Sequence, residues 1–315
     1  MSIDRRILTE AIAPLVLFVL LFAGYAGLKG GRIGAFELHN LLVSGLPLVF
    51  VALGQYWIVL TREIDLSLGP LVSIITCLLA LAGGTIAAGL LGVGVLIAIA
   101  VGFGNGTFVT RLRAPSVIVT LGTMTLLQGL ALLVLPAPSS TVPTWLTGGF
   151  GWKSGLLSTP LLMLAAVLLA CIAIGSTRFA VAARAVGLDA AAARLNGIEV
   201  GRIRRVAFVL GALFALLSGV VLTAATYSGA PSIGNSYILS SLTAVVVGGV
   251  ALSGGRGSPL GVVLGCYSLT VLANILYLAH VPSYFQSLVE GCVLLAAVSL
   301  SLVRMPRHSR KEAAT

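Results

Sequence analysis

Apolar windows long enough to cross a bilayer follow one another along almost the whole chain. A helix needs about 20 predominantly apolar residues to cross the hydrocarbon. Only 9% of the 315 residues are charged, against about 25% in soluble domains, so the chain could not cover itself with polar surface in water. The windows lie at roughly 11–28, 40–60, 67–88, 90–110, 115–135, 156–175, 206–226, 237–253, 258–279 and 282–303. The sequence therefore predicts one all-α, polytopic membrane domain over residues 1–315, with about ten transmembrane helices, some of them broken or re-entrant.

The distribution of cationic side chains predicts the orientation of these helices. The net charge is +10, and in a soluble protein this charge would suggest a nucleic-acid partner. Here the Arg and Lys residues lie in short segments between apolar windows, so membrane topology explains them and no nucleic acid is expected. With a cytoplasmic N-terminus, 16 of the 19 cationic residues lie inside, and Lys29, Arg32 and Lys153 lie outside. We therefore expect both termini in the cytoplasm.

The stretch TREIDLSLGP, residues 61–70, places charges between two apolar windows. Arg62 and Glu63 lie near the predicted inner face and can reach water by snorkelling. Asp65 is followed at once by apolar residues, so we interpret Asp65 or Ser67 as the cap of the third span, with Gly69 in a structural role. Direct solute contact and proton coupling by Asp65 stay open as alternatives, because a charge in the bilayer centre costs about 2.5–3.5 kcal/mol.

Other polar groups lie inside the predicted spans. Hydroxyl and amide groups could line a solute pathway with Asp65, or could form helix–helix hydrogen bonds instead; they belong to Asn105, Thr120, Thr123 and Gln128. Glu290 is expected to be buried against a basic or hydroxyl partner.

Glycines recur in two different patterns along the spans. The closely spaced Gly102, Gly104 and Gly106 are expected to loosen or break a helix just before Asn105. Gly257, Gly261 and Gly265 stand four residues apart, a spacing that permits close approach of two helices.

Only one predicted inner segment is long, at residues 176–205. Within it DAAAARLNG predicts a short helix, with Asp189 as N-cap and Gly197 in the left-handed position after the last turn. A helix of this length is marginal on its own in water. The segment is either an amphipathic connector or a docking helix for a cytoplasmic protein.

The sequence contains no recognisable motif for ATP hydrolysis and no metal-ligand pattern. GGFGWKS, the string most similar to a P-loop, has Trp152 where the last Gly is required and falls in the predicted outer loop 136–158. That loop is either an interfacial loop or a docking surface for an external partner. The four cysteines lie in apolar windows and are interpreted as small core residues. No catalytic residue, metal or cofactor is expected on this chain.

Four segments, taken together, resemble the sugar-type ABC permease family, the membrane subunits of ribose, xylose and galactose importers. Their order and spacing follow that family from about residue 40 to 300, and Glu63 is a departure where the family has Gly. The segments are EIDLSLGP (63–70), GNGTFVTRLRAPSVIVTLGTM (104–124), AVGLDAAAARLNGI (185–198) and VVVGGVALSGGRGSPLGVVLG (245–265).

The resemblance implies a bacterial inner-membrane permease that imports a monosaccharide or similar polar solute by alternating access. It implies four kinds of partner: a cytoplasmic ABC ATPase that binds ATP and Mg, a periplasmic solute-binding protein, a second permease copy or paralogue, and membrane lipid. Coupling to the ATPase is then expected in the inner loop, at Arg184, Gly187, Asp189, Ala192, Arg194, Gly197 and Ile198. A secondary transporter driven by protons through Asp65 or Glu290 is the main alternative, and an intramembrane enzyme is a third hypothesis.

Overall fold

Helices account for almost all regular structure in this computed structural model, which describes residues 3–81, 86–148 and 158–303. Within those ranges the only β pairing is an isolated bridge between Ser139 and Gly229, so the all-α prediction is confirmed. Trp152 and Lys153, together with the cations beyond residue 303, lie outside the described residues. The helices are α1 (Ile3–Leu28), α2 (Ala35–Leu60), α3 (Leu68–Leu81), α4 (Ile86–Arg111), α5 (Ser116–Val134), α6 (Thr144–Thr147), α7 (Thr159–Gly175), α8 (Arg178–Leu188), α9 (Ala190–Leu195), α10 (Val200–Thr226), the 3-10 turn η1 (Ile233–Asn235), α11 (Ser236–Val247), α12 (Pro259–Leu278) and α13 (Ser283–Val303).

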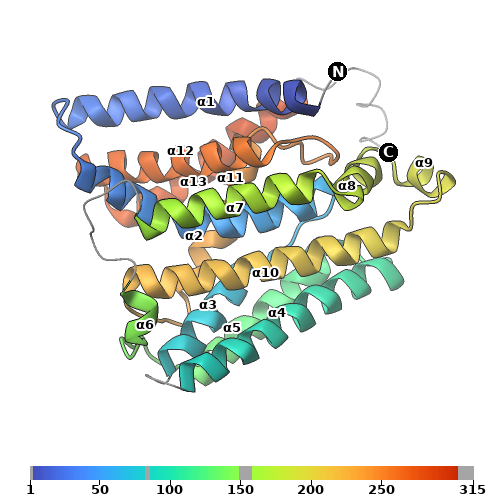
Figure 1. Cartoon of the computed structure of the whole chain (residues 1–315), viewed down its shortest axis with the longest axis horizontal. Coiled ribbons are helices and arrows are strands. Elements are labelled where there is room, and N and C mark those ends of the chain that lie inside the picture. Colours follow the sequence, from blue (N-terminus) through green and yellow to red (C-terminus); the bar gives the residue numbers. More distant parts are fainter. Residues whose placement is uncertain (1–2, 82–85, 149–157, 304–315) are drawn as a thin grey trace.

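The long helices lie side by side, and α8 and α9 project from one end of the bundle (Figure 1). A helix satisfies its own backbone groups, which is why an apolar chain in hydrocarbon adopts this form. α2 lies at the centre, with 83% of its most apolar window buried, whereas α1 is peripheral with 11%. α10 packs against α4, α2 and α3, and α1 packs mainly against α12.

Helix lengths do not establish the predicted ten crossings. Among the residues that the structure describes, six helices are long and apolar enough to cross a membrane, namely α1, α2, α4, α5, α10 and α12. The pair α7 and α8, bent by 72°, would make a seventh span if counted together. α3 and α11 have only 14 and 12 residues, so ten spans stay a prediction.

Two predicted span boundaries are wrong. The window 67–88 holds α3, which ends at Leu81, and α4 already begins at Ile86. The window 237–253 holds α11, which ends at Val247. The reason in the second case is a glycine-rich loop, because Gly249, Gly254 and Gly255 have φ angles of 81°, 83° and 73°, which are not helical and which favour glycine.

The short helices α3 and α11 are each the helical part of a broken span. Segment 62–67 precedes α3, and segment 228–235 precedes α11. The second segment runs back along α3, since the Thr76 hydroxyl donates to the Ala230 carbonyl (3.4 Å) and the Gly234 N–H donates to Ser73 Oγ (2.9 Å). The N-termini of α3 and α11 therefore meet inside the bundle, and α11 continues from there toward the end that carries α8.

The predicted break at Gly102, Gly104 and Gly106 is wrong, because α4 is continuous from Ile86 to Arg111. Two of these glycines serve close packing instead. A Cβ on Gly102 would lie 2.7 Å from the Phe208 carbonyl oxygen of α10, and one on Gly106 would lie 2.8 Å from the Arg205 Cα. Gly104 has open space at its Cβ position, so only one face of α4 requires glycine.

The glycines of the second pattern do permit close approach. Cβ atoms on Gly261 and Gly265 of α12 would collide with the carbonyls of Gly248 and Ala244 at the end of α11. Gly257 lies before α12, where its φ of 138° and its contact with Val250 shape the preceding loop.

Replacing Gly102 by Leu is expected to destabilise the bundle, because the new side chain has no room against the α10 backbone. Overpacking of this kind lowers the free energy of unfolding by about 1–3 kcal/mol. Thermal unfolding in detergent measures the effect, with Gly104→Leu as the matched control on the same helix. Equal unfolding temperatures for the two variants would contradict the assigned packing.

Candidate functional site

Segment 62–67 has unwound backbone inside the bundle, and its N–H groups are all hydrogen-bonded. Non-helical backbone at membrane depth is tolerated only where other groups satisfy it. Side chains of neighbouring helices supply the longest-range partners: Ser116 Oγ accepts from Ile64 N–H (3.2 Å) and Thr120 Oγ1 accepts from Leu66 N–H (3.2 Å). The α5 hydroxyls therefore hold the broken span in place.

The remaining N–H groups find partners close by. Glu63 N–H donates to the Ile58 carbonyl (3.3 Å), and Ser67 N–H donates to Asp65 Oδ1 (2.7 Å). The Gln55 amide, in the orientation that its neighbours require, accepts from Asp65 N–H (3.2 Å) and donates to the Asp65 carbonyl (3.1 Å). Gln55 and Ser116 were not identified from the sequence, where they resemble many isolated polar residues of membrane helices.

Asp65 is at the centre of a buried side-chain network. Its Oδ1 also accepts from the Ser67 hydroxyl (2.6 Å), and its Oδ2 accepts a longer bond from Asn105 Nδ2 (3.4 Å). Asn105 Nδ2 also donates to Ser67 Oγ (3.0 Å), and Asn105 Oδ1 accepts from the Thr123 hydroxyl (2.6 Å). Asp65 lies just before α3, whose N-terminal dipole favours a carboxylate. Ser67 is the residue whose carbonyl begins that helix, since it accepts from Leu71 N–H (3.0 Å).

The structure thus brings together four of the five residues predicted for the pathway: Asp65, Asn105, Thr120 and Thr123. Gln128 lies apart from them, and its Nε2 donates to Asn235 Oδ1 (3.3 Å) at the start of α11. Gly69 lies where the broken spans meet, since its Cβ would be 2.6 Å from the Gly234 carbonyl oxygen. Glycine there allows the two helix N-termini to touch.

Glu63 does not snorkel to water as predicted. Its side chain pairs with Arg204 of α10 (3.0 Å), and the residue is only 9% exposed. The neighbouring Arg62 is exposed, as predicted. The opposite charge at the start of α10 is a tertiary partner, 141 positions further along the chain, and local sequence could not reveal it. For Glu290, the predicted hydroxyl partner is Ser240, whose hydroxyl donates to Oε2 (2.6 Å).

The predicted helix of the 176–205 segment is confirmed as α9. Asp189 Oδ1 accepts from the N–H groups of Ala191 (2.8 Å) and Ala192 (3.0 Å), and Gly197 has a φ of 78°. A second helix, α8, was not predicted from the sequence. Thr177 caps it by accepting from Ala180 N–H (3.4 Å), and a Thr before a run of helix-forming residues is the signal that could have identified it.

α8 is anchored to the end of α2 and to the glycine-rich loop before α12. Gly187 lies against the Leu60 carbonyl and the Gly255 N–H, which are themselves hydrogen-bonded (2.9 Å). Arg184 Nη2 donates to Tyr56 Oη (3.3 Å). Ile198 packs with the small apolar cluster formed by α8, α9 and α10. A displacement of α8 would therefore act directly on α2 and on the loop that begins α12.

α9 is exposed where α8 is anchored. Leu195 is 91% exposed, and Ala192 and Arg194 are also exposed. An exposed leucine at the tip of a projecting helix is available to a partner protein. The predicted coupling residues thus divide into two groups: Arg184 and Gly187 face the bundle, whereas Ala192 and Arg194 face outward.

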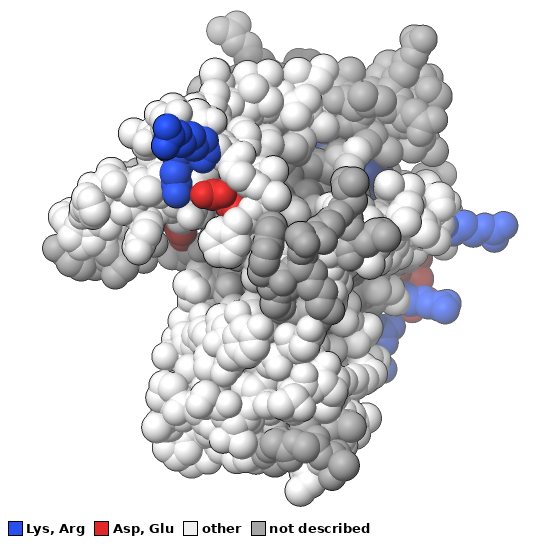
Figure 2. All heavy atoms as spheres, turned by 60° about the vertical axis from the view of Figure 1, so that its left-hand side comes forward, with Lys and Arg blue, Asp and Glu red and all other residues white. Residues whose placement is uncertain are grey.

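Charge is distributed unequally between the two ends of the bundle. α8, α9, the first turn of α10 and the last turn of α4 carry Arg residues at one end. Figure 2, turned toward the opposite end, shows a largely uncharged face with one small charged cluster at the upper left, while further Lys and Arg side chains lie at the right edge of the view. The described residues include no group of three His, Cys, Asp or Glu side chains that could hold a metal. Cys77, Cys171 and Cys266 are buried as expected, but Cys292 is exposed.

Membrane-length helices, two broken spans that meet inside the bundle and a helix pair that projects from one end together define a membrane permease. Over residues 38–298 the chain matches the family described as "Branched-chain amino acid transport system / permease component", and it belongs to that family. The sequence-based expectation of a permease family is thereby confirmed.

Many relatives match most of the chain, and three of them illustrate the likeness. The ribose import permease protein RbsC of Bacillus subtilis (strain 168) is 32% identical, with 84% of this chain and 82% of the relative covered. The autoinducer 2 import system permease protein LsrC of Yersinia pseudotuberculosis serotype O:1b is also 32% identical, with 92% and 83% covered. The probable ABC transporter permease protein YphD of Escherichia coli (strain K12) is 33% identical, with 95% and 91% covered. No solved structure matches the chain.

Replacing Thr120 by Val is expected to destabilise the protein by about 1–3 kcal/mol, because the buried Leu66 N–H would lose its acceptor. Thr125→Val is the matched control, since Thr125 on the same helix also donates to the carbonyl four residues earlier (3.1 Å) but is exposed. Thermal unfolding of both variants in detergent is the measurement. If Thr125→Val lowered the stability as much as Thr120→Val, the lost Leu66 hydrogen bond would not be the cause.

Proposed function

We propose that this chain is the membrane permease subunit of an ATP-driven importer for a monosaccharide or a similar polar solute. The observation that carries the proposal is the match, over most of the chain, to permeases named for the import of ribose and of autoinducer 2. The family description itself names branched-chain amino acids, so the solute class rests on the relatives.

We place the motor on a separate cytoplasmic ABC ATPase, which binds ATP and Mg and docks on α8 and α9. The exposed α9, with Arg194 and Leu195, provides the contact. The anchored α8, with Arg184 and Gly187, transmits movement of the ATPase to α2 and to the loop before α12. A rigid coupling element needs one face toward the ATPase and one toward the membrane bundle. The exposed residues of α9 supply the first face and the anchored residues of α8 supply the second.

We orient the chain with both termini in the cytoplasm, in a bacterial inner membrane, with about ten spans. The Arg-rich end that carries α8 and α9 then faces the cytoplasm, in agreement with the positive-inside rule. A periplasmic binding protein delivers the solute to the opposite end. A second permease copy or paralogue completes the transporter.

The two broken spans are the elements that we expect to move during alternating access. Transporters commonly place their solute sites where discontinuous helices meet, and here the N-termini of α3 and α11 meet beside Gln128 and Asn235. The network of Asp65, Asn105, Thr120 and Thr123 is mutually satisfied, so its role is to hold the first broken span. Solute contact is then expected at Gln128 rather than at Asp65. No observation favours proton coupling, because Asp65 and Glu290 both have hydrogen-bond partners.

Solute uptake is expected to require ATP and the partner proteins. Proteoliposomes containing the permease, its ATPase and its binding protein should import the cognate solute with ATP present. Dissipating the pH gradient should leave that uptake unchanged. Uptake by the permease alone, driven by a pH gradient, would overturn the proposed function in favour of a secondary transporter.

Replacing Leu195 by Ser is expected to weaken ATPase docking about tenfold, because burying a leucine side chain contributes about 1.5–3 kcal/mol. Co-purification of the ATPase and ATP-dependent uptake measure the loss. Leu28→Ser is the matched control, since Leu28 is exposed at the opposite end of the bundle. Labelling of Leu195→Cys from the periplasmic side of intact cells would contradict the orientation and the docking site together.

A further inference from the structure

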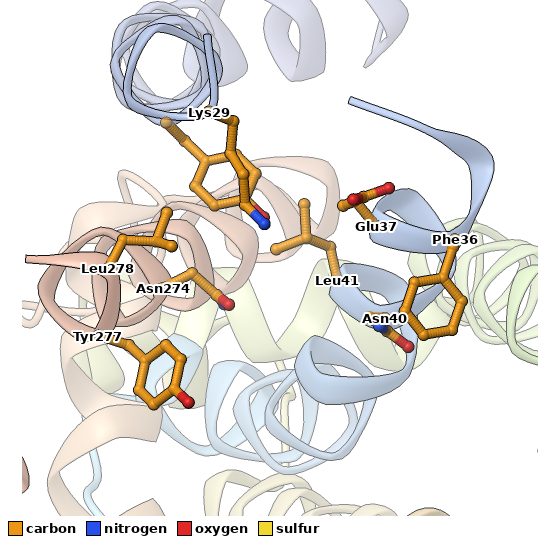
Figure 3. Close-up of a pocket in the computed structure, with 9 residues that line it drawn as sticks. Lys29, Phe36, Glu37, Asn40, Leu41, Asn274, Tyr277 and Leu278 are labelled. Atoms are coloured by element: carbon orange, nitrogen blue, oxygen red, sulfur yellow. The ribbon is translucent and has the colours of Figure 1, made fainter. Parts of the chain in front are cut away.

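A pocket of about 180 Å³, lined by both polar and apolar side chains, lies at the end of the bundle opposite α8 and α9 (Figure 3). It opens where three helices end: Lys29 follows α1, Glu37 lies in the first turn of α2, and Asn274 lies near the end of α12. A position just beyond the ends of membrane helices corresponds to the level of lipid headgroups. None of its lining residues comes from the broken spans or the coupling helices, so the proposed import mechanism does not use it.

The two charges of the pocket do not neutralise each other. Within the described residues the Lys29 ammonium has no hydrogen-bond or ion-pair partner. The Glu37 carboxylate accepts one bond, at Oε2 from the Gly34 N–H (3.0 Å), and its second oxygen is left over. In Figure 3 the Lys29 side chain points into the pocket from α1, and Glu37 lies across from it on α2. A ligand that carries both an anionic and a cationic group would complement this pair.

The rest of the lining suits a headgroup joined to apolar chains. Asn274 Nδ2 donates to the Thr270 carbonyl (2.8 Å), so its amide oxygen is left as an acceptor, and Figure 3 shows that oxygen facing the middle of the pocket. Leu41 and Leu278 supply apolar wall, and the exposed rings of Phe36 and Tyr277 lie at the rim. Aromatic rings at the ends of spans are typical of the membrane interface.

We propose that this pocket binds the headgroup of phosphatidylethanolamine, with the phosphate at Lys29 and the ammonium at Glu37 and the Asn274 carbonyl oxygen. Both ends of the headgroup form charge-assisted hydrogen bonds, which are the stronger kind. Phosphatidylcholine has the same two charges, but its quaternary ammonium has no N–H to donate. Phosphatidylglycerol has the phosphate and no cation. All three lipids carry the phosphate, so comparing them tests the ammonium half of the site, and variants of Lys29 test the phosphate half.

The test is a titration of the purified chain in detergent with each of the three lipids, all with the same short acyl chains, followed by native mass spectrometry. Phosphatidylethanolamine is expected to bind about tenfold more tightly than the other two, since hydrogen bonds to charged groups contribute roughly 1.5–3 kcal/mol. Equal binding of the three lipids would overturn the proposal. Soluble glycerophosphoethanolamine carries the same headgroup without acyl chains. If it displaced bound phosphatidylethanolamine as strongly as the lipid itself does, the ligand would not need to be a lipid.

Variants assign the two halves of the headgroup to the two charges. Glu37→Gln is expected to lose the preference for phosphatidylethanolamine, and the Gln at position 37 can still accept from the Gly34 N–H. Lys29→Gln is expected to weaken the binding of all three lipids, because each carries the phosphate, whereas Lys29→Arg keeps the charge and should keep the affinity. Arg32→Gln is the matched control, because Arg32 is a cation of the same connection that does not line the pocket. Weaker binding in Arg32→Gln or Lys29→Arg, unchanged affinity in Lys29→Gln, or an unchanged preference in Glu37→Gln would contradict the site. Because binding is measured without transport, neither outcome affects the proposed import function.

Discussion

Satisfaction of unwound backbone inside an apolar bundle is the constraint on which the rest of this structure depends. Hydrocarbon offers no hydrogen bonds, so each N–H of segment 62–67 needs a partner within the protein. The carbonyls of Val59 and Ile58 accept from the first two of these groups. Ser116 and Thr120 of α5, Gln55 of α2 and the Asp65 carboxylate provide partners for the other four. The residues that first suggest a solute site are therefore required by the backbone before any solute is considered.

The same constraint links the broken spans to the parts of the molecule that transmit force. Asn105 joins the Asp65 network to α4, and α4 lies against α10 through Gly102 and Gly106. α10 begins beside α9, and its Arg204 pairs with Glu63 at the start of the first broken span. α8 contacts the end of α2 and the glycine-rich loop that follows α11. A movement at α8 thus has short physical routes to both broken spans, and an importer driven by a cytoplasmic motor needs such routes.

Membership in the permease family indicates a transport function, and the residues of this chain distinguish between a proton-driven and an ATPase-driven mechanism. Asp65 and Glu290, the two acids that a proton-driven transporter would use, both have hydrogen-bond partners in the bundle. The exposed Leu195 and the anchored Gly187 instead divide the α8–α9 pair into an outward face and a face on the bundle. That division is the property a coupling element requires.

The sequence by itself determined that this is a membrane protein of the all-helical class, that α9 forms with its Asp189 cap, and which family the chain belongs to. These properties depend on composition and on local patterns a few residues long. Only the tertiary structure decided that α4 is continuous, that α3 and α11 are halves of broken spans, and that Glu63 pairs with Arg204. The physical reason is that the local sequence around a glycine is the same whether that glycine interrupts a helix or allows a second helix to pack closely against it. Its role depends on what lies opposite its missing Cβ, as the α10 backbone does at Gly102, and local sequence does not contain that neighbour.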